Sequence, residues 1–163
     1  MTESMGLDPG WQIGGPGGGG ATFFPTFHPT DSQRVAIRCD MTGIYLSADG
    51  GDSWRQHNLT SSAHAFAFER DAPDVVYAGT TGLFRTDDFG DNWQQLFPTP
   101  AETLGRGYLG DHADFQFRLK PDSVYPSPSG SVAAILIHPE DRNVLYVAVN
   151  SRDSATLCRS ADR

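Results

Sequence analysis

The carboxylates of this 163-residue sequence differ in whether they repeat, and this decides which of them could do acid–base chemistry. Asp49 and Asp88 hold the same place in two copies of the pattern hydroxyl-x-Asp-x-Gly-Asp-x-Trp, at residues 47–54 and 86–93. A residue that recurs in every unit of a repeat serves the unit itself. Asp40 has no carboxylate counterpart in the other units, which makes it the candidate acid or base.

Asp40 follows a run of strand-forming residues at 34–39. Gly79 takes its place in the second unit, and Asn150 takes it in the third. A carboxylate can donate or accept a proton in a reaction, which general acid–base catalysis requires. A solvated acid without a chemical role is the alternative at this position.

Histidines repeat as well. His28 and His138 each precede a proline at the same place in the first and third units, so we interpret both as turn residues and not as ligands or bases. Asp111, His112 and Asp114 have the donor types of a metal site, but three residues in one loop are a weak signal. We predict no metal and no cofactor.

The glycine-rich run at 15–20 formally fits a dinucleotide-binding fingerprint. Residues 21–24 after it predict a strand, whereas a phosphate site of this kind needs a helix N-terminus there. Two interpretations stay open. The run is either a flexible entry segment or a backbone surface that a flat ligand can approach closely, since glycine has no side chain.

The elements that position these residues are predicted to be strands, because no segment shows a helical period over eleven residues. In the first unit, runs punctuated by Pro, Asp and Gly lie at 21–27, 34–39, 43–47 and 53–58. A period near ~40 residues with four strands per unit is typical of β-propeller blades. The sequence predicts an all-β chain with a glycine-rich entry segment at 1–20 and a partial β-propeller at 21–163, comprising blades at about 21–58, 63–97 and 131–163 and an insertion loop at 98–130.

The third unit begins the repeated pattern at Ser160 and stops before its Gly and Trp. Three units also fall short of the roughly four blades of the smallest propellers. We therefore expect an N-terminal fragment of a longer protein.

In antiparallel blades, the loop between the second and third strands lies on the face opposite the first-to-second and third-to-fourth turns. We therefore expect Asp40 on the face that carries the glycine-rich entry and much of 98–130.

The composition argues against two classes of binding partner. The net charge is −8 and Lys120 is the single lysine, so clustered cations for nucleic acid or anionic membranes are missing, and we predict neither partner. No run approaches the ~18 apolar residues of a membrane span. We interpret Cys39 and Cys158 as buried small residues. We expect the chain to be a monomer. No signal peptide is visible; the compartment is undetermined, with secretion or a periplasmic location of the complete protein left open.

The repeated pattern resembles the Asp-box, or bacterial neuraminidase repeat, which lies on the hairpin between the third and fourth strands of a blade. Asp and Ser or Thr side chains can bind the amides of their own turn, and Gly allows positive φ. We expect the Trp ring to pack against the next blade. The pattern indicates a fold and says little about function.

A second resemblance covers the start of the chain. Trp11, the glycines at 17–20, the Phe-His-Pro at 27–29 and the Arg-Cys-Asp-Met-Thr-Gly-Ile-Tyr at 38–45 resemble the opening of glycoside hydrolase family 74, which comprises xyloglucanases and related endo-glucanases built from two seven-bladed propellers. Thr42 departs from the family's Gly at that place.

The resemblance implies that Asp40 is one of two catalytic carboxylates in an inverting hydrolysis, with the second outside this chain and the 163 residues alone inactive. Substrate contacts are then expected from the entry segment and the insertion: Trp11, Gly18, Gly19, Arg106, Tyr108 and His112. Phe115 is a further candidate for stacking on sugar rings. The alternative is a non-catalytic Asp-box propeller that binds protein or glycan, as in sortilin-type receptors or assembly factors.

Overall fold

The computed structural model describes residues 10–12, 14–17, 21–40, 43–59, 61–109, 114–123, 130–150 and 154–162. These residues form four small antiparallel sheets and one 3-10 turn, η1 (Pro100–Glu102), with no α-helix among them. In the same residues, no helix has the length and apolar character needed to cross a membrane. The fold class is all-β, as the sequence predicts, and none of the described sheets closes on itself.

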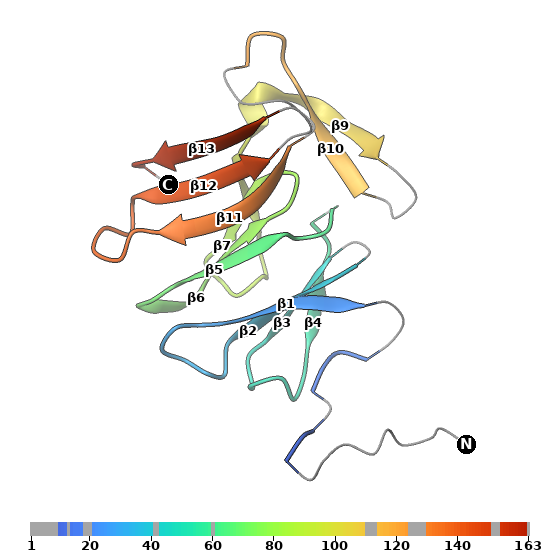
Figure 1. Cartoon of the computed structure of the whole chain (residues 1–163), viewed down its shortest axis with the longest axis vertical. Helices are drawn as coiled ribbons and strands as arrows, with labels where there is room; N and C mark the ends of the chain where they lie inside the picture. The colour runs from blue at the N-terminus through green and yellow to red at the C-terminus, as the bar shows by residue number, and fades with distance from the viewer. Residues whose placement is uncertain are drawn as a thin grey trace.

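Three sheets correspond to the three predicted units, and in each of them the strands pair in chain order. The first sheet contains β1 (Thr22–Phe27), β2 (Val35–Cys39), β3 (Ile44–Ser47) and β4 (Arg55–His57). The second contains β5 (Ala65–Glu69), β6 (Ala72–Gly79), β7 (Leu83–Thr86) and β8 (Gln94–Phe97). The third contains β11 (Ser131–Ile137), β12 (Leu145–Asn150) and β13 (Ala155–Ser160). The sheets follow one another along the long axis of the molecule (Figure 1).

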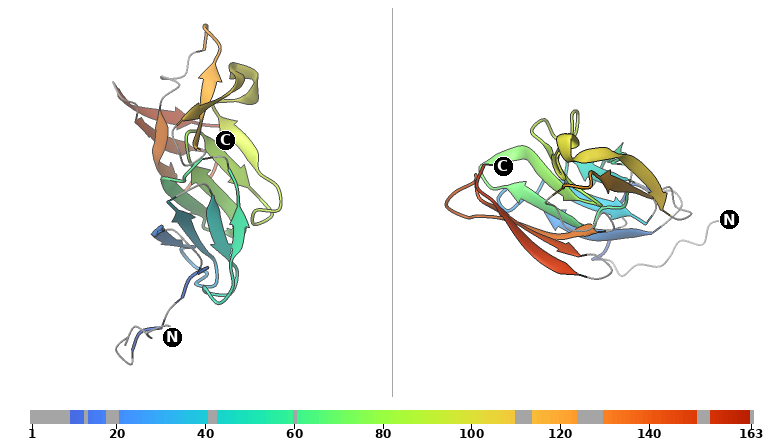
Figure 2. Two further views of the ribbon diagram at one scale, coloured as in Figure 1. Left: turned by 90° about the vertical axis from the view of Figure 1, so that its right-hand side faces the viewer. Right: turned by 90° about the horizontal axis from the view of Figure 1, so that it is seen from above.

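The prediction of an insertion loop at 98–130 is wrong over much of that segment. Strands β9 (Thr103–Leu109) and β10 (Asp114–Leu119) form an antiparallel hairpin at the end of the molecule away from the first sheet (Figures 1 and 2). Phe115, Phe117 and Leu119 alternate with polar residues, which is the period of a half-buried strand. The ring of Phe117 is 5% exposed and lies 6.3 Å from that of Phe84, so the hairpin is anchored on the second sheet.

Two apolar cores join the sheets. The core between the first and second sheets includes Ile44, Leu46 and Phe84, and the core between the second and third includes Leu83, Leu145 and Val147. The second sheet contributes to both. Burial of these apolar side chains is the main favourable term that holds neighbouring sheets together. Cys39 is buried as predicted, whereas Cys158 is only half-buried at the edge of the second core.

The antiparallel order sorts the connections onto two ends of the sheets. Residues 40, 58–59, 61–64 and 80–82 lie at one end, which we call the Asp40 end. The opposite end, which we call the turn end, carries residues 28–34, 48–54, 69–71, 87–93 and 138–144. Hydrogen bonds cross between sheets at both ends: from Ser62 Oγ to the carbonyl of Asp40, and between His28 Nε2 and the carbonyl of Glu69. Asp40 therefore lies at the end predicted from the loop order.

Candidate functional site

The carboxylate of the first repeated turn is occupied by that turn. Ser47 Oγ accepts the N–H of Gly51 at 2.8 Å and donates to Asp49 Oδ1 at 2.8 Å. Asp49 accepts both the N–H and the hydroxyl of Ser53. These donors, the hydroxyl and N–H of Ser53 first and the hydroxyl of Ser47 next, lower the pKa of Asp49 to about 2.

The second repeated turn has the same bonds. Thr86 Oγ1 accepts the N–H of Gly90 and donates to Asp88, which accepts the side-chain amide and the backbone N–H of Asn92. The Asn92 donors, side chain first, lower the pKa of Asp88 to about 2. Neither Asp88 nor Asp49 is therefore a proton donor near neutral pH.

The prediction for the two tryptophans needs a correction. Trp93 packs against the core between the first and second sheets, and its ring lies edge-on to His57 of β4 at 6.1 Å. It therefore contacts the preceding sheet, whereas the sequence predicted a contact with the next one. Trp54 is half-buried and donates its Nε1–H to the carbonyl of Gly51, so its indole closes its own turn.

Both repeated histidines serve turns, as predicted. Nδ1 of His28 accepts the N–H groups of Thr30 and Asp31, and Nδ1 of His138 accepts two N–H groups in the same way. Because Nδ1 of His28 accepts, the ring proton lies on Nε2, which donates to the carbonyl of Glu69 at 2.9 Å. This histidine therefore links the first sheet to the second.

Asp40 is half-buried directly after β2. Its N–H donates to the carbonyl of Ala21 at 2.9 Å, and its own carbonyl accepts the hydroxyl of Ser62 at 3.3 Å. The thiol of Cys39 lies 3.3 Å from Asp40 Oδ1. The carboxylate thus stands where the chain enters β1, leaves β2 and connects the first sheet to the second.

Among the other predicted contact residues, the structure describes the side chains of Trp11 and Arg106. Trp11 is 74% exposed, so solvent surrounds most of its ring. Arg106 lies on the β9–β10 hairpin, and its guanidinium is 5.3 Å from the ring centroid of Phe117. The Phe117 ring in turn anchors the hairpin on the second sheet. Tyr108 belongs to β9. Gly18, Gly19 and His112 lie outside the described residues, as do Asp111 and the side chain of Asp114.

The hairpin meets the Asp40 end of the second sheet. Thr81 Oγ1 donates to the carbonyl of Phe115 at 2.8 Å, and a side chain at Gly82 would lie 2.7 Å from the Phe117 ring. The N–H of Val132 donates to the carbonyl of Thr80, which brings the start of β11 to the same place. This part of the 98–130 segment packs on the fold.

Two features were missed at the level of sequence. The first is a cluster of Phe23, Phe24 and Arg38 near Asp40. The available signal was the pair of consecutive phenylalanines before Pro25, because two successive side chains of a regular strand cannot both face one core. The second feature is Glu69, which aligns with His28 and His138 of the other units and is 4% exposed.

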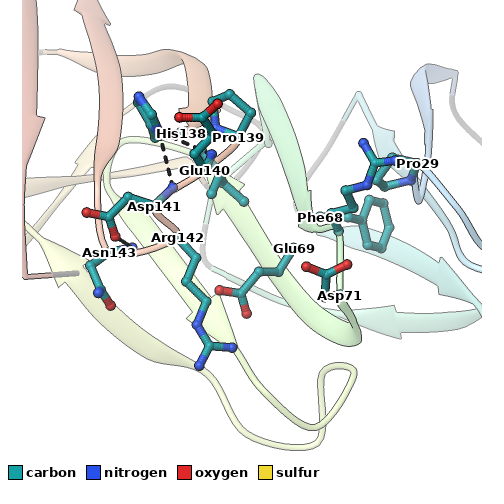
Figure 3. A pocket seen from close by; sticks show the side chains of 12 residues that line it. Pro29, Phe68, Glu69, Asp71, His138, Pro139, Glu140, Asp141, Arg142 and Asn143 are labelled. Carbon is teal, nitrogen blue, oxygen red and sulfur yellow. Dashed lines mark hydrogen bonds between the residues drawn. The ribbon is translucent and has the colours of Figure 1, made fainter.

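Glu69 contributes to a cavity of about 520 Å³ at the turn end, between the β5–β6 and β11–β12 turns (Figure 3). Its lining consists of Pro29, Phe68, Glu69, Arg70, Asp71, Ile137, His138, Pro139, Glu140, Asp141, Arg142 and Asn143. Acidic side chains outnumber arginines there. No group of three or more His, Cys, Asp or Glu that could hold a metal ion is found in the described part of the chain.

No family model matches the chain, and no curated protein matches it. Solved structures do. The crystal structure of an ancestral GH74 enzyme is 14% identical over 88% of this chain and 21% of its own length, with a TM-score of 0.44. The GH74 enzyme of Niastella koreensis is 12% identical over 82% of this chain and 27% of its own length, with a TM-score of 0.42. The chain spans about a fifth of the first protein and just over a quarter of the second, and TM-scores below 0.5 do not assign a fold or an activity.

Proposed function

We propose that the chain is part of an Asp-box β-propeller protein that hydrolyses a polysaccharide of the β-glucan or xyloglucan type. The observation that carries the proposal is the position of Asp40, a non-repeated, half-buried carboxylate at the end opposite the repeated turns. The propeller architecture is supported by three adjacent sheets with the same strand order. The first strands β1, β5 and β11 are neighbours in space.

In the proposed reaction, Asp40 is one member of an inverting pair. One carboxylic acid protonates the leaving oxygen while the other carboxylate removes a proton from the attacking water, and the two groups stand ~6.5–9.5 Å apart. Asp49 and Asp88 are excluded as the partner, because each carboxylate is held by its own turn. The partner carboxylate is proposed to come from another part of the complete protein.

The test is Asp40→Asn in the complete gene product, assayed for reducing-sugar release from xyloglucan and β-glucan. We expect kcat to fall by ~10²–10⁴-fold, since the amide can neither give nor take the proton. Oligosaccharide binding is expected to survive. The matched control is Asp49→Asn, which should keep wild-type kcat in the folded protein. An Asp40→Asn variant with wild-type kcat would contradict the proposal.

A non-catalytic binding module is the second candidate, and the cavity at the turn end favours it. That cavity has charged walls and lies at the end opposite Asp40, which suits a partner recognised by side-chain charges. The two candidates separate cleanly. A complete gene product that binds a protein or glycan but releases no reducing sugar from either polysaccharide is a binding module.

A further inference from the structure

Strand β1 holds two consecutive phenylalanines in exposed positions. Phe23 is 40% exposed and Phe24 is 54% exposed. Phe24 has a φ of 54°, in the left-handed region that a bulky side chain rarely adopts. The register of β1 against β2 shifts between Phe23 and Thr26, which marks a β-bulge. The strand is therefore distorted at the place where the two rings stand.

One guanidinium contacts both rings. Arg38 Cζ lies 4.8 Å from the centroid of Phe23 and 5.0 Å from that of Phe24. Phe23 and Arg38 are cross-strand partners, so their contact is expected on a regular sheet. Successive side chains of a regular strand point to opposite faces, so Phe24 reaches the same guanidinium because of the bulge.

The fold gains little from this distortion. A left-handed bulky residue costs stability and persists where the surroundings impose it, which is why such residues gather at functional sites. Most of the Phe24 ring faces solvent, so the burial of that ring does not compensate for the cost. Bulges next to sites typically re-aim a side chain, and here the bulge sets two aromatic rings beside one cation.

The cluster adjoins Asp40. The carbonyl that holds the Asp40 N–H belongs to Ala21, two residues before Phe23. Arg38 Nη1 donates to the carbonyl of Ala63 at 3.2 Å, which uses one of the five N–H donors of the guanidinium. Its Nε is buried with no hydrogen-bond partner in the described part of the chain, and Arg38 has no ion pair there. The buried Nε cannot reach a surface ligand, so the donors that Arg38 keeps for one are the remaining N–H groups of its two Nη atoms.

We propose that Phe23, Phe24 and Arg38 form a binding platform for one pyranose ring of a neutral oligosaccharide, next to Asp40. A pyranose has C–H groups on its face and hydroxyls around its edge; the aromatic rings match the face, and the guanidinium matches the edge. The proposal commits to a neutral sugar, because the match is made through C–H faces and hydroxyls and uses no ion pair with a sugar carboxylate. This inference rests on the proposed function and adds three residues to its binding surface.

The experiment is a titration of the 163-residue chain with cellotetraose, followed by NMR chemical shifts, with tetragalacturonate as the acidic probe. We expect Phe23→Ala and Phe24→Ala each to raise Kd for cellotetraose about tenfold. The matched control is Phe27→Ala, because Phe27 lies on the same strand, is 57% exposed and stands at the turn end. Its Kd should stay at the wild-type value.

Phe24→Gly separates binding from folding. Glycine adopts a φ of 54° without strain, so this variant should melt at or above the wild-type temperature and still lose about tenfold in affinity. Wild-type affinity in Phe24→Gly and Phe23→Ala, equal losses in Phe27→Ala, or tighter binding of tetragalacturonate would each overturn the inference. The proposed function fails separately, through Asp40→Asn with wild-type kcat.

Discussion

The turns at residues 47–54 and 86–93 make the same internal hydrogen bonds in different surroundings. In the first turn, Asp49 is followed by Gly50, whose φ is 73°. In the second turn, Asp88 is followed by Phe89, whose φ is 52°. Gly50 is exposed, whereas Phe89 is 8% exposed, belongs to the core between the first two sheets and lies 4.6 Å beneath the guanidinium of Arg34. The hydrogen bonds make the turn, and one side chain decides whether the turn also joins the core.

The largest expected effect comes from removing that side chain. Phe89→Ala should lower the free energy of unfolding by about 3 kcal/mol, because a buried ring is lost and a cavity remains. Gly50→Ala at the equivalent place adds only left-handed strain, about 1 kcal/mol. Urea unfolding of both variants measures the difference. Equal losses would mean that Phe89 adds nothing to the core.

The glycine that follows sharpens the comparison. Gly51 and Gly90 both have positive φ, so alanine is strained in both turns. A Cβ at Gly90 would lie 2.5 Å from the ring of His57, whereas one at Gly51 meets Trp54 at an ordinary 3.4 Å. We expect Gly90→Ala to cost about 2–3 kcal/mol and Gly51→Ala about 1 kcal/mol. His57→Ala should recover the excess in the Gly90 variant but not in the Gly51 variant; no recovery would place the strain elsewhere.

The two turns should behave alike towards acid. Asp49 and Asp88 both have a pKa of about 2, below the unfolded value near ~3.9. Their stabilising contribution is therefore present above pH ~3.9 and is lost as the pH falls through 2. Asp49→Asn and Asp88→Asn should each lower the melting temperature at pH 7 by about 2 °C and flatten its decline below pH 4. Unequal effects measured by thermal melts across pH would show that burial of the second turn matters to its carboxylate.

The smallest expected effect concerns His57, which contacts Gly90 and Trp93 of the second turn. Burial, and then the nearby charge of Arg55, lowers the pKa of His57 below its ordinary 6.5. The folded state thus binds fewer protons than the unfolded state, so stability falls as the pH drops below ~6.5. His57→Gln should remove this slope between pH 7 and 5, and Gln56→Ala on the same strand should keep it. A slope that persists in His57→Gln belongs to another group.

The sequence predicted the parts of the molecule that local chemistry determines. The four strands of the first unit lie within two residues of their predicted bounds, because Pro, Asp and Gly punctuate them. The bonds of Asp49 and Asp88 were predictable, since both partners of each bond lie within four residues. The end that carries Asp40 followed from strand order alone.

The parts that depend on neighbours in space were missed. The burial of Phe117 can be predicted from the alternating pattern of its strand only once a sheet is known to lie beneath the hairpin. The direction of Trp93 depends on His57, 36 residues earlier in the chain. The cluster of Phe23, Phe24 and Arg38 depends on a bulge, which a propensity scale does not register. The role of Asp40 stays a prediction, because it depends on groups that must face it.

The alternation of strand β6 between the two cores has a consequence for how the molecule opens. Val75 and Tyr77 face the third sheet, while Val76 and Ala78 face the first, and all four are buried. One strand thus couples two interfaces, as the central unit of a linear array does. Fluctuations that detach the third sheet can leave the first two intact, whereas β6 opens only with the whole. Its amides should therefore be the slowest in the chain to exchange with solvent.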